Sequence, residues 1–199
     1  MNKVITISRE YGAGGHTIGK RVAQELGIEL YDKDIVRETV RASGYDTETV
    51  QQEEEEVSRP ARSSRAFCPT VYIIPTCRMP FTTSKSGNSA LCAHRPLCHF
   101  GPLRADEILP LQRIPCLNVF IHAGDIHRAE RLRQMTGVAD PTELQRMMAK
   151  KDSLRRNYYN HYTNRQWGDS HNYHLTLDSG VLGDELCAQM IISAARGMQ

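Results

Sequence analysis

Residues 4–27 read VITISREYGAGGHTIGKRVAQELG, and this stretch decides the fold. Its first four residues are all β-branched, which predicts a short buried strand. A loop containing three glycines follows, at Gly12, Gly14 and Gly15. Apolar residues then recur every four positions and predict one face of a helix that Gly27 ends: Ile18, Val22 and Leu26. A strand, a glycine loop and a helix are typical of the opening unit of an α/β nucleotide-binding fold.

The glycine loop can be aligned in two registers. A literal G-x-x-x-x-G-K pattern covers residues 14–20, but Ile18 already belongs to the apolar helix face. Lys20 would then lie a turn inside the helix, away from the free N–H groups and the helix dipole that attract phosphate. We therefore favour the register that begins at Arg9 and ends at Thr17, with the helix starting near Thr17.

In the favoured register, six residues are candidates for binding the phosphates of a nucleotide: Gly12, Ala13, Gly14, Gly15, His16 and Thr17. The glycines permit positive φ and a close approach of the backbone to phosphate. Gly15 stands where such loops usually have lysine, and His16 stands where they usually have serine. Thr17 keeps a hydroxyl that could reach Mg²⁺ or a phosphate. Arg9, Lys20 or a basic helix are the candidates to replace the lysine. A tight turn without any ligand is the alternative interpretation.

The bulk composition predicts an ordinary globular protein. The chain has 199 residues, which favours a single domain over 1–199, and 40% of them are hydrophobic and 24% charged. A net charge of +2 argues against nucleic acid or an anionic membrane as the main partner. The sequence contains neither a signal-peptide pattern nor a run approaching about 18 apolar residues, so we expect a cytoplasmic protein with reduced cysteines.

The rest of the chain consists of segments with clear periodicity and one long segment without it. Beyond the opening unit, periodicity predicts further strands and helices: strands at 28–31, 117–123 and 173–177, and helices at 125–135, from 140 to about 159, and at 184–195, the last with Leu186, Met190 and Ala194 on one face. The segment 59–115 is anomalous, because five of the six cysteines and eight of the nine prolines lie between Arg59 and Cys116. Neither helical nor strand periodicity persists there for long.

Three stretches resemble the cytidylate kinase-like family of bacterial P-loop proteins. They are the S-R-x-Y-G-[SA]-G-G pattern at 8–15, the sequence YDKD at 31–34, and KKDSLRRNYYNHYTNRQWGDSHNYHLTLDSGVLG at 150–183. The resemblance covers about residues 1–58 and 116–199. It implies a three-layer α/β fold, with a mostly parallel sheet and helices on both faces. It also implies ATP-dependent phosphorylation of a nucleoside monophosphate, CMP or dCMP, with Mg²⁺.

The resemblance also suggests roles for charged residues. Lys151, Arg155 and Arg156 fall where a kinase lid, here about 140–170, brings cations onto the phosphates, and a solvated cationic face is the alternative. Arg128 and Arg131 are weaker lid candidates. Asp178 and Ser179 resemble a family pair near the nucleotide base. The candidates for binding the acceptor substrate or Mg²⁺ follow the second predicted strand or stand in the anomalous segment: Asp32, Lys33, Asp34 and Arg104.

The anomalous segment leads to a separate hypothesis. The family has a strand of the type V-I-V-G-R-C-A-D where this chain reads CHFGPLRAD, at 98–106. Plausible codons for HFGPLR, read one base along, spell ILGRCA. We hypothesise that about 59–104 is translated in a shifted frame, with loss of a central strand, and resequencing tests this. Three rival functions follow from the departures at Gly15 and His16 and from this segment: a non-catalytic nucleotide-binding protein, a kinase of another small molecule, and an inactive product.

Overall fold

A parallel sheet forms the centre of the molecule in the computed structural model, which describes residues 4–31, 97–100, 115–163 and 165–198. Its strands are β1 (Val4–Arg9), β2 (Glu29–Tyr31), β3 (Leu97–Phe100), β4 (Cys116–His122) and β5 (Leu175–Asp178). They lie in the order β2-β3-β1-β4-β5, and each neighbouring pair is parallel. The predicted α/β class with a parallel sheet is therefore confirmed.

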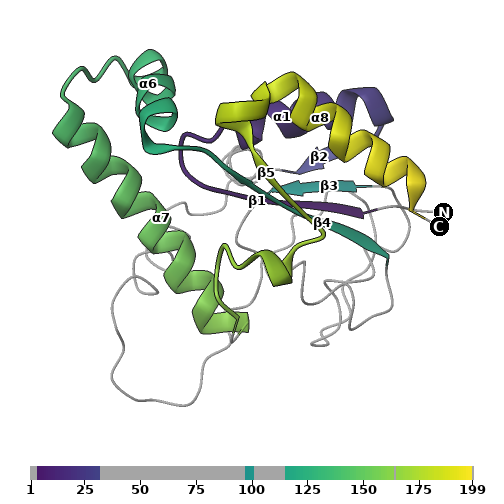
Figure 1. Cartoon of the computed structure of the whole chain (residues 1–199). Helices are drawn as coiled ribbons and strands as arrows, with labels where there is room; N and C mark the ends of the chain where they lie inside the picture. The colour runs from purple at the N-terminus through teal and green to yellow at the C-terminus, as the bar shows by residue number, and fades with distance from the viewer. Residues whose placement is uncertain (1–3, 32–96, 101–114, 164, 199) are drawn as a thin grey trace, which may run out of the picture.

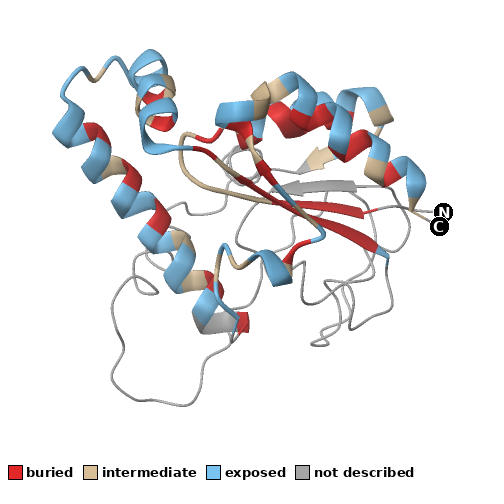
Figure 2. Cartoon of the chain, in the orientation of Figure 1, coloured by how far each residue is buried: buried red, intermediate tan, exposed pale blue. Residues whose placement is uncertain are grey.

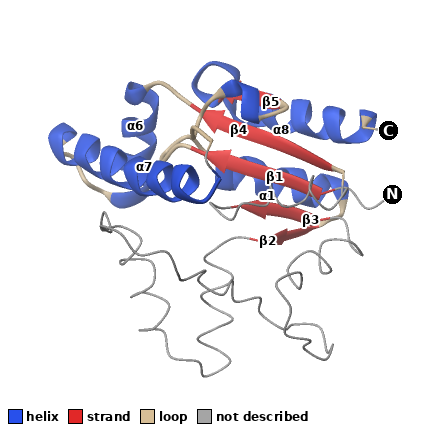
Figure 3. Cartoon of the chain, turned by 90° about the horizontal axis from the view of Figure 1, so that it is seen from below, coloured by secondary structure: helices blue, strands red, loops and turns tan. Residues whose placement is uncertain are grey.

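The helices occupy two positions around this sheet. Helices α1 (Gly15–Leu26) and α8 (Ser179–Gly197) lie side by side on one face (Figure 1). Helices α6 (Asp125–Thr136) and α7 (Pro141–Thr163) lie beyond the carboxyl ends of the strands (Figure 3). A short 3-10 helix, η1 (Ser170–Asn172), precedes β5. Within the described ranges, no helix combines the length and apolar character needed to cross a bilayer.

The core lies between the sheet and the α1–α8 layer (Figure 2). Strand β1 is buried from Val4 to Ile7, as its β-branched sequence predicts for a central parallel strand. The helix residues facing it include Ile18 and Val22, both fully buried, together with Ile191 of α8. Burying an aliphatic side chain of this size contributes roughly 1.5–3 kcal/mol, so this layer fixes the position of α1 and of the loop before it.

Two predicted helix details are wrong. Helix α1 begins at Gly15, two residues before the expected start at Thr17, because Gly14 adopts the left-handed conformation and serves as its N-cap. On α8, Leu186 and Met190 are 44% and 39% exposed, and the buried face consists of Cys187, Ala188, Ile191, Ile192 and Ala195. Apolar residues of α8 also lie on either side of its buried face, so the periodicity of the sequence does not determine which face turns toward the core.

Strand β3 is the main difference from the sequence-based expectation. It lies inside the anomalous segment 59–115 and pairs with both β1 and β2, so the central strand whose loss the shifted-frame hypothesis anticipates is present. The acceptor-site candidates Asp32, Lys33, Asp34 and Arg104 lie outside the described residues. So does most of the segment that the shifted-frame hypothesis concerns, and that hypothesis stays a prediction.

Candidate phosphate-binding site

The loop between β1 and α1 lies at the carboxyl edge of the sheet. Strand β1 is central, and the strands on its two sides, β3 and β4, lead to opposite edges of the sheet. Ligands of open α/β sheets bind in the crevice outside the carboxyl ends of the strands, where the strand order reverses. The loop therefore occupies the position at which this architecture places a ligand.

The loop backbone depends on two glycines. Gly12 has φ +84° and Gly14 has φ +75°, conformations that residues with a Cβ rarely adopt. The amide of Ala13 donates to the Glu10 carbonyl at 3.3 Å, and Ile18 closes the first turn of α1 onto the Gly14 carbonyl at 3.1 Å. Among the residues that the structure describes, no side chain caps the N-terminus of α1. The first amide groups of a helix lack intrahelical acceptors, so the start of α1 favours an anion.

A buried charge network fixes the first half of the loop. The Asp152 carboxylate of α7 accepts a hydrogen bond from the Tyr11 amide at 2.8 Å. The Arg128 guanidinium of α6 donates to the Tyr11 carbonyl at 2.8 Å and also binds Asp152. The third Arg128 nitrogen lies 3.3 Å from the Glu10 carboxylate. The Arg128 and Asp152 side chains are 7% and 10% exposed, so each needs the other as a partner.

Ser179 ties the loop to the last strand and helix of the chain. Its hydroxyl is fully buried and lies 2.7 Å from the Ala13 carbonyl and 3.1 Å from the His122 carbonyl. The neighbouring Asp178 caps α8 by accepting from the amides of Gly180 and Val181. Asp178 and Ser179, the two residues expected near a nucleotide base, therefore have distinct contacts. Ser179 binds the glycine loop, and Asp178 caps α8.

Arg131 covers the second half of the loop. It forms two hydrogen bonds with the Asp184 carboxylate, at 2.9 and 2.5 Å, and donates to the Thr17 hydroxyl at 3.2 Å. Hydrogen bonding to Asp184 raises the pKa of Arg131. A Cβ added to Gly14 would lie 2.4 Å from an Arg131 nitrogen, so any larger residue here would displace the end of the Arg131 side chain, in addition to straining the positive φ. A cation thus stands directly at the start of α1.

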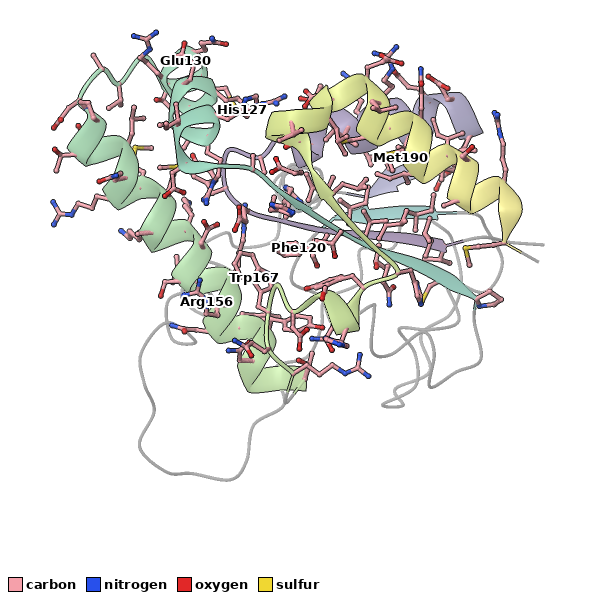
Figure 4. The ribbon with its side chains drawn as sticks, in the orientation of Figure 1. Phe120, His127, Glu130, Arg156, Trp167 and Met190 are labelled. Carbon is pink, nitrogen blue, oxygen red and sulfur yellow. The ribbon has the colours of Figure 1, made fainter. Side chains whose placement is uncertain are left out.

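The three lid candidates go to different places. Arg155 reaches the loop, where it donates to the Arg9 carbonyl at 2.9 Å and lies over the Tyr11 ring at 5.7 Å. Arg156 lies over the Trp167 ring at 5.8 Å, beside Phe120 of β4 (Figure 4). Lys151 is exposed on α7. Of the three, the structure therefore brings Arg155 alone into contact with the phosphate loop.

An open hollow of about 460 Å³ lies between α6 and the start of α8. It is lined by the β4–α6 connection and the start of α8: Gly124, Ile126, His127, Glu130, Asp178, Gly180 and Val181. Figure 4 shows His127 on the side of α6 that faces α8. Ile126 and Val181 are 90% and 81% exposed, which is unusual for large aliphatic side chains. Exposed apolar residues at a concave site suit the flat face of a nucleotide base.

The described residues fit a nucleoside triphosphate better than a metal ion bound by protein ligands alone. The loop amides and flanking arginines suit phosphates, and the hollow suits a base. No cluster of three metal-ligating side chains occurs in the described part of the chain. The Thr17 hydroxyl, the proposed Mg²⁺ ligand, accepts a hydrogen bond from Arg131. Mg²⁺ commonly takes most of its ligands from phosphates and water, so one protein hydroxyl would be enough.

Sequence reasoning missed how Arg128 and Asp152 anchor the loop. Arg128 precedes Leu132 by four residues, which places both on one face of α6, and both are buried. A charged residue on a buried helix face requires a partner of opposite charge. That signal marks Arg128 as a structural residue but does not identify Asp152, which lies 24 residues away, as its partner.

The comparisons with known proteins agree with this geometry. Residues 4–181 match the family described as the cytidylate kinase-like family. A crystal structure of an uncharacterized protein from Eubacterium ventriosum ATCC 27560 has 23% identity and a TM-score of 0.67, covering 98% of this chain and 99% of that one. A shikimate kinase from Bacteroides thetaiotaomicron has 14% identity and a TM-score of 0.50, covering 97% and 98%. No match to a curated protein was found. The structural likenesses confirm the predicted α/β fold with its parallel sheet.

Proposed function

The chain belongs to the cytidylate kinase-like family, and from that premise we propose that it transfers a phosphoryl group from ATP to a nucleoside monophosphate, CMP or dCMP. The observation that carries the proposal is the continuity of two subsites. Ser179 contacts the glycine loop at the Ala13 carbonyl, and its neighbour Gly180 lines the apolar hollow. A phosphate cradle and a base-sized hollow are therefore adjacent, as a bound ATP requires.

Each part of the site has a proposed role in this reaction. The amides at the start of α1 bind the phosphates, and Arg155 and Arg131 neutralise their charge, which is most of what phosphoryl transfer requires from a protein. The other lid candidates, Lys151 and Arg156, and the acceptor candidates Asp32, Lys33, Asp34 and Arg104 remain part of the proposal. The Thr17 hydroxyl would help to hold the Mg²⁺ that accompanies ATP, and that ion would supply charge neutralisation of the transferring phosphoryl group.

A second function is favoured by one specific feature. Gly15 and His16 replace the lysine and serine of a standard phosphate loop, and a loop without them is suited to binding nucleotide without rapid turnover. The alternative is therefore a non-catalytic or weakly active nucleotide-binding protein. A kinase of another small molecule is a further alternative, because the acceptor candidates lie outside the described residues.

A nucleotide panel distinguishes these functions. ATP consumption would be measured with CMP, dCMP, UMP, AMP and GMP, and ATP binding would be measured by calorimetry. We expect ADP formation that depends on CMP or dCMP. Tight ATP binding without turnover of any acceptor would favour the non-catalytic function. An absence of ATP binding by the folded protein would overturn the kinase and the non-catalytic proposals together.

A variant of Val181 tests the base hollow separately from the phosphate loop. Val181→Asp places a charge on the apolar lining, and we expect about tenfold weaker ATP binding because a side chain of this size contributes about 1.5 kcal/mol when buried. Tripolyphosphate has no base, so its affinity should not change. Met135→Asp is the matched control, since Met135 is 70% exposed on α6 and does not line the hollow. Equal ATP binding by Val181→Asp and wild type would place the base elsewhere.

A further inference from the structure

Gly15 is needed for space, and one side chain occupies that space. A Cβ built on Gly15 would lie 2.3 Å from Cδ, 2.9 Å from Cβ and 3.2 Å from Cγ of Arg9. Real Cβ atoms essentially never approach other atoms closer than 3.0 Å. Gly15 is the first residue of α1, so its helical backbone does not itself require glycine. The aliphatic stem of Arg9 therefore runs through the volume in which any side chain at position 15 would begin.

Position 15 is where a standard phosphate loop places its lysine, whose ammonium reaches the β- and γ-phosphates. In this chain a long cationic side chain crosses the same volume, but it comes from the end of β1. We propose that Arg9 replaces the missing lysine, lying across the bare Gly15 to bring a guanidinium to the phosphates of the bound nucleotide. This inference rests on the proposed nucleotide-binding function and names the cation on which that function depends.

A second guanidinium contacts the backbone of Arg9. Arg155 donates to the Arg9 carbonyl and is 24% exposed. Its burial, and next the charge of Arg9, lower the pKa of Arg155 to about 10. The nearby Asp152 carboxylate, 3.7 Å from Arg155, already binds Arg128 and the Tyr11 amide. The positive charges of Arg9 and Arg155 repel each other, and a phosphate placed beside both would relieve that repulsion.

Arginine suits this role for chemical reasons. Its guanidinium stays charged at neutral pH and offers several donors in a planar fork that matches phosphate oxygens. Its stem is long enough to pass over a glycine and still extend beyond it. Any residue larger than glycine at position 15 would displace that stem. The pair Arg9 and Gly15 therefore acts as one unit, and their substitutions should not be additive.

The test is a swap between the two positions. Arg9→Ala should weaken binding of ATP and of tripolyphosphate by about tenfold or more, as expected for loss of a charge-assisted hydrogen bond. Gly15→Lys should also weaken binding, because its Cβ collides with the Arg9 stem. The double variant Arg9→Ala/Gly15→Lys clears the volume and restores a lysine, so its affinity should exceed that of either single variant. Arg9→Lys should retain part of the wild-type affinity.

Lys20 provides the discriminating variant. It belongs to the rival alignment of the loop and is exposed in the second turn of α1. We expect Lys20→Met to bind ATP as wild type does. Circular dichroism melting of every variant identifies any that fails to fold, and Arg9→Lys keeps the proposal testable if Arg9→Ala unfolds.

The outcomes separate this inference from the proposed function. If wild-type protein binds no ATP, the proposed function fails. If wild type binds ATP but folded Arg9→Ala and Arg9→Lys bind equally well, or if the double variant is no better than the weaker single variant, the role of Arg9 is refuted while the proposed function stands. Loss of binding in Lys20→Met alone would support the rival alignment instead.

Discussion

The two halves of the glycine loop are held in opposite ways. In the first half, the amide and carbonyl of Tyr11 are both bound by buried side chains, Asp152 and Arg128. In the second half, no side chain among the described residues caps the start of α1, and the side chains beside it are Arg9 against Gly15 and the Arg131–Asp184 ion pair against Gly14. We propose that this difference is a division of labour, in which the first half is anchored to α6 and α7 and the second half binds an anion.

The largest expected effect comes from breaking the anchor. Arg128→Met leaves the buried Asp152 carboxylate without its main partner, and removal of one member of a buried ion pair costs about 3–5 kcal/mol. We expect the free energy of unfolding, measured by urea denaturation, to fall by that amount. ATP affinity should fall as well, because the first half of the loop loses its support.

Arg133→Met is the matched control for this prediction. Arg133 lies on the same helix and pairs with Glu130 at 2.9 Å, but its side chain is 56% exposed. Substitutions at exposed pairs of this kind usually change stability by less than about 0.5 kcal/mol. Equal losses in the two variants would show that the Arg128 network does not anchor the loop.

The second half of the loop was easier to predict from the sequence than the anchor that holds the first half. Its glycines, the strand before it and the helix after it are local features, and each leaves a pattern within a few residues. The anchor depends on contacts between residues far apart in the chain. Arg128 and Tyr11 are separated by 117 residues, and Tyr11 and Asp152 by 141. Such pairings follow from the packing of α6 and α7 and leave no local signature.

Helix α7 also shows that a sequence pattern does not determine which side chains reach the loop. The basic run on α7 predicts cations that reach the phosphates, and one of its residues, Arg155, contacts the loop backbone. Its neighbour Arg156 points about 100° further around the helix and meets Trp167 instead. Strand β3 was not predicted for a different reason. Its four residues lie in a segment without periodicity, and their strand conformation comes from pairing with β1 and β2.

Substitutions at two glycines should have effects of intermediate size on the unfolding free energy. Gly14→Ala strains a residue with φ +75° and drives a Cβ into Arg131 and Asp184. Gly27→Ala strains a residue with φ +63° but meets nothing within 4 Å. We expect a loss of about 1–2 kcal/mol in unfolding free energy for Gly27→Ala, from the backbone alone, and a larger loss for Gly14→Ala.

The two glycine variants should differ most in nucleotide binding. Gly14→Ala displaces Arg131 from the start of α1, so ATP affinity measured by calorimetry should fall, whereas Gly27→Ala lies at the other end of the helix and should bind ATP normally. If both variants lost the same stability and both bound ATP as wild type does, the close packing of Arg131 over the loop would have no role in binding.

The smallest effect should be confined to binding. Thr17 is exposed, so Thr17→Val should change the unfolding free energy by less than about 0.5 kcal/mol. Its hydroxyl is the proposed contact to Mg²⁺ or phosphate, and loss of one hydrogen bond to a charged group corresponds to about tenfold weaker binding of Mg²⁺–ATP. Thr142→Val, at an exposed position near the start of α7, should change neither quantity. Because Thr17→Val would weaken binding without loss of stability, it is the converse of Gly27→Ala. If it instead destabilised the fold and bound ATP normally, the second half of the loop would be a structural turn like the first, and the division between anchor and binding surface would be wrong.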